Sequence, residues 1–158
     1  MTQTSPDYLF QAWQMRIPYQ YAAGAAVGRF LEELRDNGRI YGNKCPQCGR
    51  VLVPPRIACG RCHIRMDEWI DLGTKGTVIS YTVCEQAFLD PSFGELREVP
   101  YTFGAILMDG ADGVMQHLLK ETNASKLRIG MRVQAVFKPR EQRKGNIRDI
   151  IHFETIEK

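Results

Sequence analysis

The sequence predicts a mainly β protein, with N-terminal helices followed by a cysteine-rich loop and a small five-stranded barrel. Three observations support this fold class. Helical periodicity is confined to the first 42 residues, four of the five cysteines fall in two close pairs, and alternating strand patterns fill the C-terminal half. We expect a helical segment over residues 1–42, a cysteine-rich segment over 43–72 and a barrel over 73–158.

Two amphipathic helices are expected in the N-terminal segment. The first should end or kink at Pro18, because a proline ring cannot continue a helix. The second is expected from Ala22 to Asp36 and should stop at Asn37-Gly38, because glycine accepts the left-handed conformation that closes a helix. The apolar stripes are Tyr8, Leu9, Trp13 and Ile17 in the first helix, and Val27, Phe30, Leu31 and Leu34 in the second.

Turn signals divide residues 74–156 into five strands with a two-residue period, and five short strands without a long helix are typical of a small barrel. The aspartate–glycine pairs at Asp109 and Asp112 predict a turn between the second and third strands. Phe103 and Phe137 are expected to face the core. The predicted strands are Gly76–Cys84, Tyr101–Met108, Gly113–Leu119, Arg132–Phe137 and Ile147–Phe153.

The longest connection, from Glu85 to Pro100, is unusually apolar for a loop and contains Phe88 and Phe93. Apolar side chains in a surface loop generally pack on their own domain, a ligand or a partner protein. We therefore expect this loop to take part in binding or packing.

Two C-x2-C turns separated by ten residues predict a metal site made by Cys45, Cys48, Cys59 and Cys62. Four thiolates converging on one ion form a closed tetrahedral shell that favours zinc and leaves no position for water or substrate. The metal is therefore expected to be structural. The segment reads as a rubredoxin-like zinc ribbon, followed by a five-stranded barrel of the OB type.

The remaining thiol and a histidine next to the ribbon have simpler interpretations. His63 directly follows Cys62 and is expected to be a surface residue rather than a ligand. Cys84 ends the first barrel strand and should be a buried or half-buried strand residue, since nothing in the sequence places a catalytic base beside it. Trp69 is expected at the junction between ribbon and barrel.

Charge is uneven along the chain, although the net charge is only +3. Eight basic residues and one acid lie between Lys126 and Arg148, so this part should attract an anionic partner. No apolar run is long enough to span a bilayer, and the N-terminus lacks the features of a signal peptide. We expect a cytoplasmic protein that does not contact membranes.

The order of motifs resembles a zinc-ribbon/OB-fold family associated with acyl-coenzyme A metabolism and long catalogued as a domain of unknown function. The resemblance covers nearly the whole chain. It rests on Pro54-Pro55-Arg56 between the cysteine pairs, Gly73-x2-Gly76 at the barrel entry, Met108-Asp109-Gly110 and Ile129-Gly130-Met131-x-Val133.

The resemblance implies a non-catalytic accessory subunit that forms hetero-oligomers with a thiolase-like enzyme, an aldolase, or an acyl-CoA hydratase or dehydrogenase. It implies that the helices and ribbon dock the partner, while the barrel lies near the acyl-CoA channel. Arg56 should either hydrogen-bond ribbon carbonyls or reach a partner or phosphate. The other candidate acyl-CoA contacts are Phe88, Phe93, Tyr101, Arg128, Arg132, Lys138 and Arg140.

Three other functions remain open on the sequence. A nucleic-acid-binding protein is the main alternative, because OB barrels and zinc ribbons occur in such proteins and the basic stretch could follow phosphates. However, the predicted strands contain few exposed aromatic residues. The candidates are Tyr81 and Tyr101. A stand-alone enzyme lacks a recognisable catalytic motif. An iron-loaded electron carrier would give the purified protein a visible colour.

Overall fold

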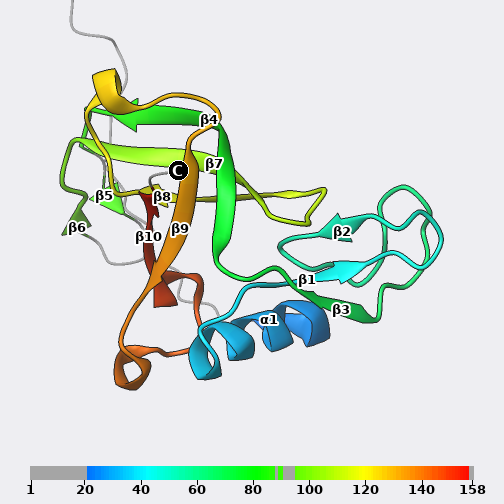
Figure 1. Ribbon diagram of the computed structural model, residues 1–158. Helices are drawn as coiled ribbons and strands as arrows, with labels where there is room; N and C mark the ends of the chain where they lie inside the picture. The colour runs from blue at the N-terminus through cyan, green and yellow to red at the C-terminus, as the bar shows by residue number, and fades with distance from the viewer. Residues whose placement is uncertain (1–20, 88, 91–94, 157–158) are drawn as a thin grey trace, which may run out of the picture.

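The computed structural model describes residues 21–87, 89–90 and 95–156. A three-stranded ribbon sheet extends to one side of the barrel, and one helix lies below the sheet (Figure 1). The first predicted helix and the candidate contacts Phe88 and Phe93 lie outside the described residues.

Helix α1 spans Gly24–Asp36 and confirms the second predicted helix, beginning two residues later than expected. Its buried stripe consists of Ala26, Phe30 and Leu34, spaced by four residues so that they share one face. Val27, which the sequence placed on this stripe, is instead exposed. Gly38 follows the helix at φ 61°, as expected for a glycine stop.

The ribbon sheet has the order β2-β1-β3 and consists of antiparallel pairs. Strand β1 is Tyr41–Lys44, β2 is Val51–Leu52 and β3 is Glu68–Asp71. The first cysteine pair lies between β1 and β2, and the second lies between β2 and β3. Strand β3 then leads into the first strand of the barrel.

The barrel is closed and has the strand order β10-β8-β7-β4-β9. Four of its neighbouring pairs are antiparallel, while β8 and β10 are parallel at Leu119 and Phe153. This is the small closed barrel expected from the sequence. The barrel strands are β4 Lys75–Cys84, β7 Tyr101–Met108, β8 Val114–Leu119, β9 Arg132–Phe137 and β10 Ile150–Thr155.

Short elements occupy the connections of the barrel. The long loop after β4 holds a small hairpin of β5 (Leu89–Asp90) and β6 (Glu95–Leu96). Three 3-10 turns follow: η1 at Ala124–Lys126, η2 at Arg140–Gln142 and η3 at Ile147–Asp149.

The last strand begins later than predicted, because residues 147–149 form the turn η3 instead of extended backbone. Asp149 explains this difference. Its carboxylate is fully buried and accepts hydrogen bonds from the backbone N–H groups of Lys144, Gly145 and Asn146 at 2.9, 2.7 and 3.2 Å. Asn146 completes a capping box with Asp149, which favours a helical turn over a strand.

A β-bulge between Val78 and Ser80 reverses the alternation of β4. Val78 faces the core before the bulge, and Tyr81 and Val83 face it afterwards. On β7, Thr102 and Ile106 are buried while Phe103 is 38% exposed, so the prediction that Phe103 faces the core is wrong. The prediction for Phe137 is confirmed, because its side chain packs against the core.

One hydrophobic core joins the helix, the inner end of the ribbon and the barrel. Phe30 and Leu34 of α1 meet Val51 and Val53 of the ribbon, and the cluster continues to Phe153 of β10. A smaller cluster surrounds Cys45, Cys59 and Met66. Because side chains from all three segments share one core, the ribbon is held rigidly on the barrel.

Candidate metal centre and ligand face

The two cysteine pairs lie on matching turns. In the first, Cys45 N–H donates to the Arg50 carbonyl at 2.8 Å, and Gly49 N–H donates to the Cys45 carbonyl at 3.0 Å. In the second, Cys59 N–H donates to the Ile64 carbonyl at 2.9 Å, and His63 N–H donates to the Cys59 carbonyl at 2.8 Å. The repeated bonds bring each pair of sulfurs to the same side of its turn.

His63 and Gly49 occupy equivalent positions at the ends of these turns. Both have left-handed backbones, with φ of 56° and 72°. Glycine adopts this conformation without strain, whereas histidine does so at a modest cost. His63 is exposed, which confirms the expectation of a surface residue.

The four Sγ atoms lie within 4.8 Å of one another, and those of Cys48 and Cys59 are 3.8 Å apart. A tetrahedral zinc ion with Zn–S bonds of about 2.3 Å separates its sulfurs by about 3.8 Å. The cage therefore fits zinc, and the predicted zinc ribbon is confirmed. With all four positions filled by thiolates, the ion would be structural.

The electrostatics of the cage also fit a cation. Backbone N–H groups of Cys62 and Arg61 lower the pKa of the Cys59 thiol to about 6. Burial and the neighbouring cysteines raise the pKa of the Cys62 thiol to about 12. The backbone thus stabilises one thiolate. Deprotonating the other cysteines places more negative charge in the same cage, and this charge is stabilised by a positive ion among the sulfurs.

Asn43, which the sequence did not single out, holds the ribbon together from inside. Its side chain is fully buried. The amide donates to the carbonyls of Arg56 at 2.5 Å and Met66 at 3.1 Å, and its oxygen accepts from Arg56 N–H at 3.1 Å. Asn43 therefore joins β1 to the Pro54-Pro55-Arg56 segment and to the residues after the second cysteine pair.

Arg56 contributes its backbone to this network. Within the described residues its hydrogen bonds are those of the peptide groups, so the prediction that its guanidinium bonds ribbon carbonyls is wrong. The side chain is exposed. Its predicted contact with a partner or phosphate stays a prediction.

Trp69 packs against the helix rather than at the junction expected from sequence. The guanidinium carbon of Arg29 lies 4.4 Å from the centroid of the Trp69 ring, a cation–π geometry. These two residues also line a small hollow of about 210 Å³ between the start of α1 and the ribbon residues on either side of the second cysteine turn. Trp69 thus fixes the helix beneath the ribbon sheet.

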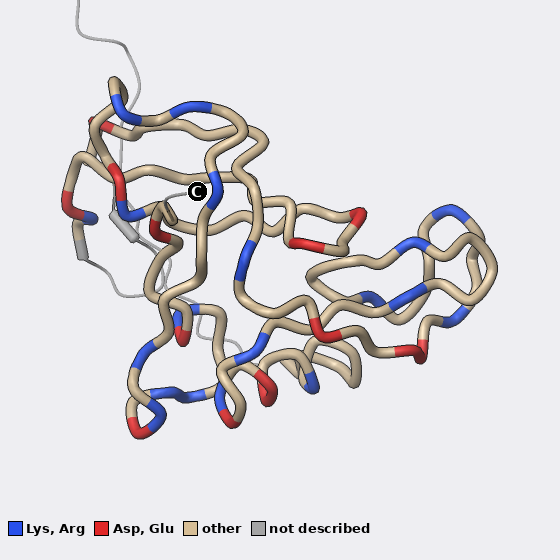
Figure 2. The backbone as a smooth tube through the Cα atoms, in the orientation of Figure 1, with Lys and Arg blue, Asp and Glu red and all other residues tan. Residues whose placement is uncertain are grey.

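The ribbon carries a second basic run that sequence reasoning overlooked. Five basic residues and no acid lie between positions 44 and 66, and Figure 2 shows the blue segments on the ribbon loops. Lys44 pairs with Glu68 at 3.4 Å, and Arg65 pairs with Asp67 at 2.8 Å. The other three, Arg50, Arg56 and Arg61, form no ion pair with any described residue.

The predicted basic contacts of the C-terminal third do not form one patch. Arg128 follows η1 and Arg140 lies in η2, and these turns occur at opposite ends of the barrel (Figure 1, yellow and orange). Lys138 is half-buried after β9. The guanidinium of Arg132 donates to Asp109 at 2.7 Å and to Thr77 at 2.9 Å, and it holds the pKa of the Asp109 carboxyl below its usual value.

Tyr101, the other predicted contact, lies at the start of β7 opposite Cys84 at the end of β4. The two side chains hydrogen-bond, which raises the pKa of the Tyr101 hydroxyl. The Arg97 guanidinium carbon is 5.2 Å from the centroid of the Tyr101 ring. Cys84 is half-buried, as expected.

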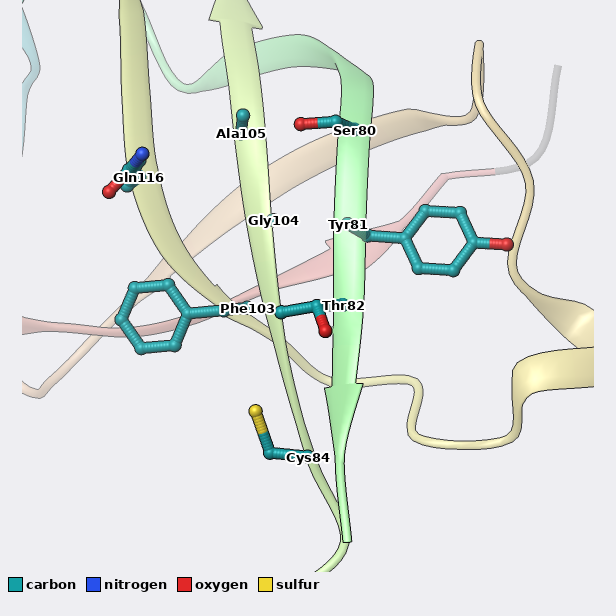
Figure 3. Close-up of a pocket in the computed structure, with 8 residues that line it drawn as sticks. All are labelled: Ser80, Tyr81, Thr82, Cys84, Phe103, Gly104, Ala105 and Gln116. Carbon is teal, nitrogen blue, oxygen red and sulfur yellow. The ribbon is translucent and has the colours of Figure 1, made fainter.

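Two adjoining hollows, of about 380 and 300 Å³, share Phe103 and Gln116. The first is lined by β4, β7 and β8, whereas the second also involves Arg97, the turn η3 and strand β10. Figure 3 shows the side chains of Ser80, Thr82 and Cys84 leaving one side of β4, with Tyr81 leaving the other. Tyr81 reaches the Leu127 carbonyl at 3.0 Å on that other side. Tyr81 thus borders the first hollow while its ring lies on the other side of β4, whereas Phe103, which was expected in the core, lines both hollows.

Comparison with known proteins identifies the family. The family description "ChsH2, rubredoxin-like zinc ribbon domain" matches residues 33–67, and "ChsH2, C-terminal OB-fold domain" matches residues 69–138. The two matches together cover more than half of the chain, so the chain belongs to the family of proteins in which a ChsH2-type zinc ribbon precedes an OB-fold domain. The resemblance found in the sequence is thereby confirmed.

Two curated relatives are both called "DUF35 domain-containing scaffold protein". The protein from Methanocaldococcus jannaschii is 27% identical over 113 residues, which cover 71% of this chain and 77% of the relative. The protein from Pyrococcus furiosus is 27% identical over 110 residues, which cover 70% of this chain and 76% of the relative.

Two solved structures share the fold. One, described as "Ltp2-ChsH2(DUF35) aldolase", has a TM-score of 0.61 at 19% identity and covers 86% of this chain and 98% of that chain. The other, a DUF35 protein of unknown function from Sulfolobus solfataricus, has a TM-score of 0.56 at 18% identity and covers 81% and 83%. Within the described part of the chain, no helix has the length and apolar character needed to cross a membrane.

Proposed function

We propose that this chain is a non-catalytic accessory subunit that docks on an acyl-CoA-processing enzyme and helps to bind or channel acyl-CoA. The partner is a thiolase-like enzyme, an aldolase, or an acyl-CoA hydratase or dehydrogenase, and it performs the covalent chemistry. We place the pair in the cytoplasm.

The observation that carries this proposal is the closed metal centre on a shared core. Four thiolates fill the coordination shell, so the ion would stiffen the ribbon instead of activating a substrate. The ribbon in turn packs on the core of the barrel. A rigid projection of this kind suits docking, since little conformational entropy is lost when it binds.

The surface chemistry of the ribbon favours a protein partner with an acidic surface. Arg50, Arg56 and Arg61 supply positive charge, and Ile57 is 59% exposed among them in the sequence. Apolar anchors surrounded by charged side chains are typical of protein interfaces. The scaffold names of the relatives and the aldolase named for the similar structure point in the same direction.

Co-purification from the native host tests this function. The tagged chain should recover an acyl-CoA-processing enzyme in a defined ratio, measured by size-exclusion chromatography and mass spectrometry. The zinc-site variant Cys48→Ser should lose the enzyme, whereas the matched variant Cys84→Ser should keep it. Recovery of nucleic acid without such an enzyme, together with salt-sensitive gel shifts, would favour the nucleic-acid alternative.

A further inference from the structure

The two cysteines of each metal-binding turn differ in exposure. Cys45 and Cys59, the first cysteine of each pair, are 0% and 2% exposed. Cys48 and Cys62, the second of each pair, are only half-buried. One side of the cage is therefore sealed by the protein, whereas the other side reaches the surface. A reagent in solution meets the cage on the side of Cys48 and Cys62.

The surface around these two half-buried cysteines is positively charged. Arg50 lies two residues after Cys48, and Arg61 directly precedes Cys62. Both arginines are exposed, and neither forms an ion pair within the part of the chain that the structure describes. Partly exposed cysteines in electropositive surroundings are the reactive ones in proteins, because positive charge favours the nucleophilic thiolate. The outer side of the cage thus combines access with reactivity.

A reaction partner for Cys48 lies in the other turn. Its Sγ atom is 3.8 Å from the Sγ atom of Cys59. Each sulfur is carried by its own hydrogen-bonded turn, so the two turns face each other across the cage. Two sulfurs at this separation need only a small movement to form a bond. A disulfide between them would tie the first turn to the second.

Met66 connects the cage to the surface of the ribbon. Its side chain is 3% exposed and packs in one apolar cluster with Cys45 and Cys59. Met66 also lines the hollow of about 210 Å³ beside Ile57 and Trp69. A movement of the sulfurs is therefore passed on, through one buried side chain, to the exposed part of the ribbon.

We propose that the metal centre is an oxidation site, at which a hydroperoxide joins Cys48 to Cys59, releases the zinc and switches off docking of the partner enzyme. This inference rests on the proposed function and adds a mode of regulation to it. The oxidation itself depends only on the exposure, charge and spacing of the ribbon cysteines.

The reaction proceeds in two steps. The Cys48 thiolate attacks the outer oxygen of the hydroperoxide, so that an S–O bond forms, the O–O bond breaks and the departing alkoxide takes a proton from water. The Cys59 thiolate then attacks the sulfenic sulfur, which forms the S–S bond and expels hydroxide. The two sulfurs lose two electrons, and the hydroperoxide gains them.

The disulfide changes the ligand set of the cage. Only Cys45 and Cys62 remain as thiolates, which is too few for the closed shell of four that a structural zinc site requires. Cellular thiols can reverse the reaction by attacking the disulfide, and the four thiols are then free to bind zinc again. The oxidation is therefore a reversible switch.

The zinc-loaded chain carrying Cys84→Ser tests the proposal, because this substitution removes the one thiol outside the cage. Hydrogen peroxide is the probe, a chromogenic chelator follows zinc release, and mass spectrometry of non-reduced digests locates disulfides. One zinc ion should leave for each Cys48–Cys59 disulfide, and dithiothreitol with added zinc should restore the metal. With Trp13→Phe as a second substitution, the fluorescence of Trp69 should change together with zinc release.

Matched charge variants locate the attack. Arg50→Gln/Arg61→Gln should slow zinc release about threefold, since it removes positive charge beside the half-buried cysteines. Arg128→Gln/Arg140→Gln removes the same charge away from the cage and should react like the parent chain. Unfolding curves show that the variants being compared are folded. Equal rates in the two double variants would contradict attack on the outer side of the cage.

Other results would overturn the oxidation site itself. Zinc could stay bound in excess hydrogen peroxide, or the first disulfide could form within one turn, as Cys45–Cys48 or Cys59–Cys62. Co-purification separates the switch from the accessory role, because the reduced chain should recover the acyl-CoA enzyme and the oxidised chain should not. Recovery by both forms would refute the switch and keep the accessory role. Recovery by neither form, with the Cys48–Cys59 disulfide present, would refute the accessory role and keep the oxidation site.

Discussion

The carboxylate of Asp112, in the turn between β7 and β8, accepts a hydrogen bond of 2.8 Å from the backbone N–H of Val51 in ribbon strand β2. The Val51 carbonyl in return accepts from Asp112 N–H at 2.8 Å and from Gly113 N–H at 3.3 Å. A Cβ atom at Gly113 would lie 3.2 Å from the Val53 carbonyl oxygen, so the turn approaches the ribbon closely. The metal centre and the barrel are therefore coupled through one turn.

Replacing Asp112 by alanine should weaken this coupling. The Val51 N–H would lose a charged acceptor, which should lower the free energy of unfolding by about 1–2 kcal/mol. Urea unfolding followed by circular dichroism measures the change. As a control, Asp67→Ala removes a carboxylate that is 70% exposed and should cost less than about 0.5 kcal/mol. Equal losses of unfolding free energy in the two variants would show that the Asp112 hydrogen bond contributes no more to stability than an exposed carboxylate does.

Asn43→Ala should destabilise the ribbon more strongly. The substitution leaves the Arg56 and Met66 carbonyls and the Arg56 N–H without a buried partner. The expected loss is about 3 kcal/mol, and the melting temperature should fall by roughly 6–12 °C. The exposed Asn37, whose side chain bonds only Glu33 in the described part of the chain, provides the comparison. A melting temperature as high as that of Asn37→Ala would mean that the network around Asn43 is dispensable.

Zinc removal should unfold the ribbon and expose its thiols. Zinc contributes about 10–16 kcal/mol to the folding of small finger peptides, more than a short segment can gain from its own core. Cys48→Ser should therefore lose its zinc by elemental analysis and expose its remaining ribbon cysteines to alkylation. Cys84→Ser should retain the metal. Lowering the pH should release zinc as well, because protons compete with the ion for thiolates. A stable, metal-free ribbon in Cys48→Ser would contradict the structural role.

The features that were predicted correctly from the sequence are those determined by local residue patterns. Cysteine spacing located the metal site, since a C-x2-C turn fixes the sulfurs within a few residues of chain. The bounds of Tyr101–Met108 and Arg132–Phe137 agree with β7 and β9 as observed. Turn chemistry at Asp109 and Asp112 correctly ended β7 and began β8.

The sequence could not show what depends on contacts between distant residues. Asn43 and Asp112 bond groups that are 13 to 61 positions away, and no local pattern marks them. The bulge after Val78 shifts the phase of the two-residue period in β4, so Tyr81 faces the core instead of the surface. On β7 the alternation is regular and buries Thr102, Gly104 and Ile106, which leaves Phe103 on the outer face. The basic stretch is continuous in the sequence, but the barrel places η1 and η2 at opposite ends.

His117 should make stability depend on pH. Burial lowers the pKa of its imidazole below the ordinary value of 6.5. Below pH 6.5 the unfolded chain therefore binds more protons at this site than the folded chain does. The free energy of unfolding should fall as the pH drops from about 6.5 through the lower pKa of the folded state.

The variant His117→Gln should remove part of this dependence, because glutamine is neutral throughout and keeps an amide that can bond near the Ile147 carbonyl. Urea unfolding at several pH values gives the free energy of unfolding of both proteins, and the slopes of this free energy against pH are compared. Zinc release at low pH affects both proteins alike, so it does not contribute to the difference between the slopes. Burial also lowers the pKa of His152, so the double variant His117→Gln/His152→Gln should have the shallowest slope. If His117→Gln and the wild type lost stability in parallel below pH 6.5, protonation of His117 would not be coupled to unfolding.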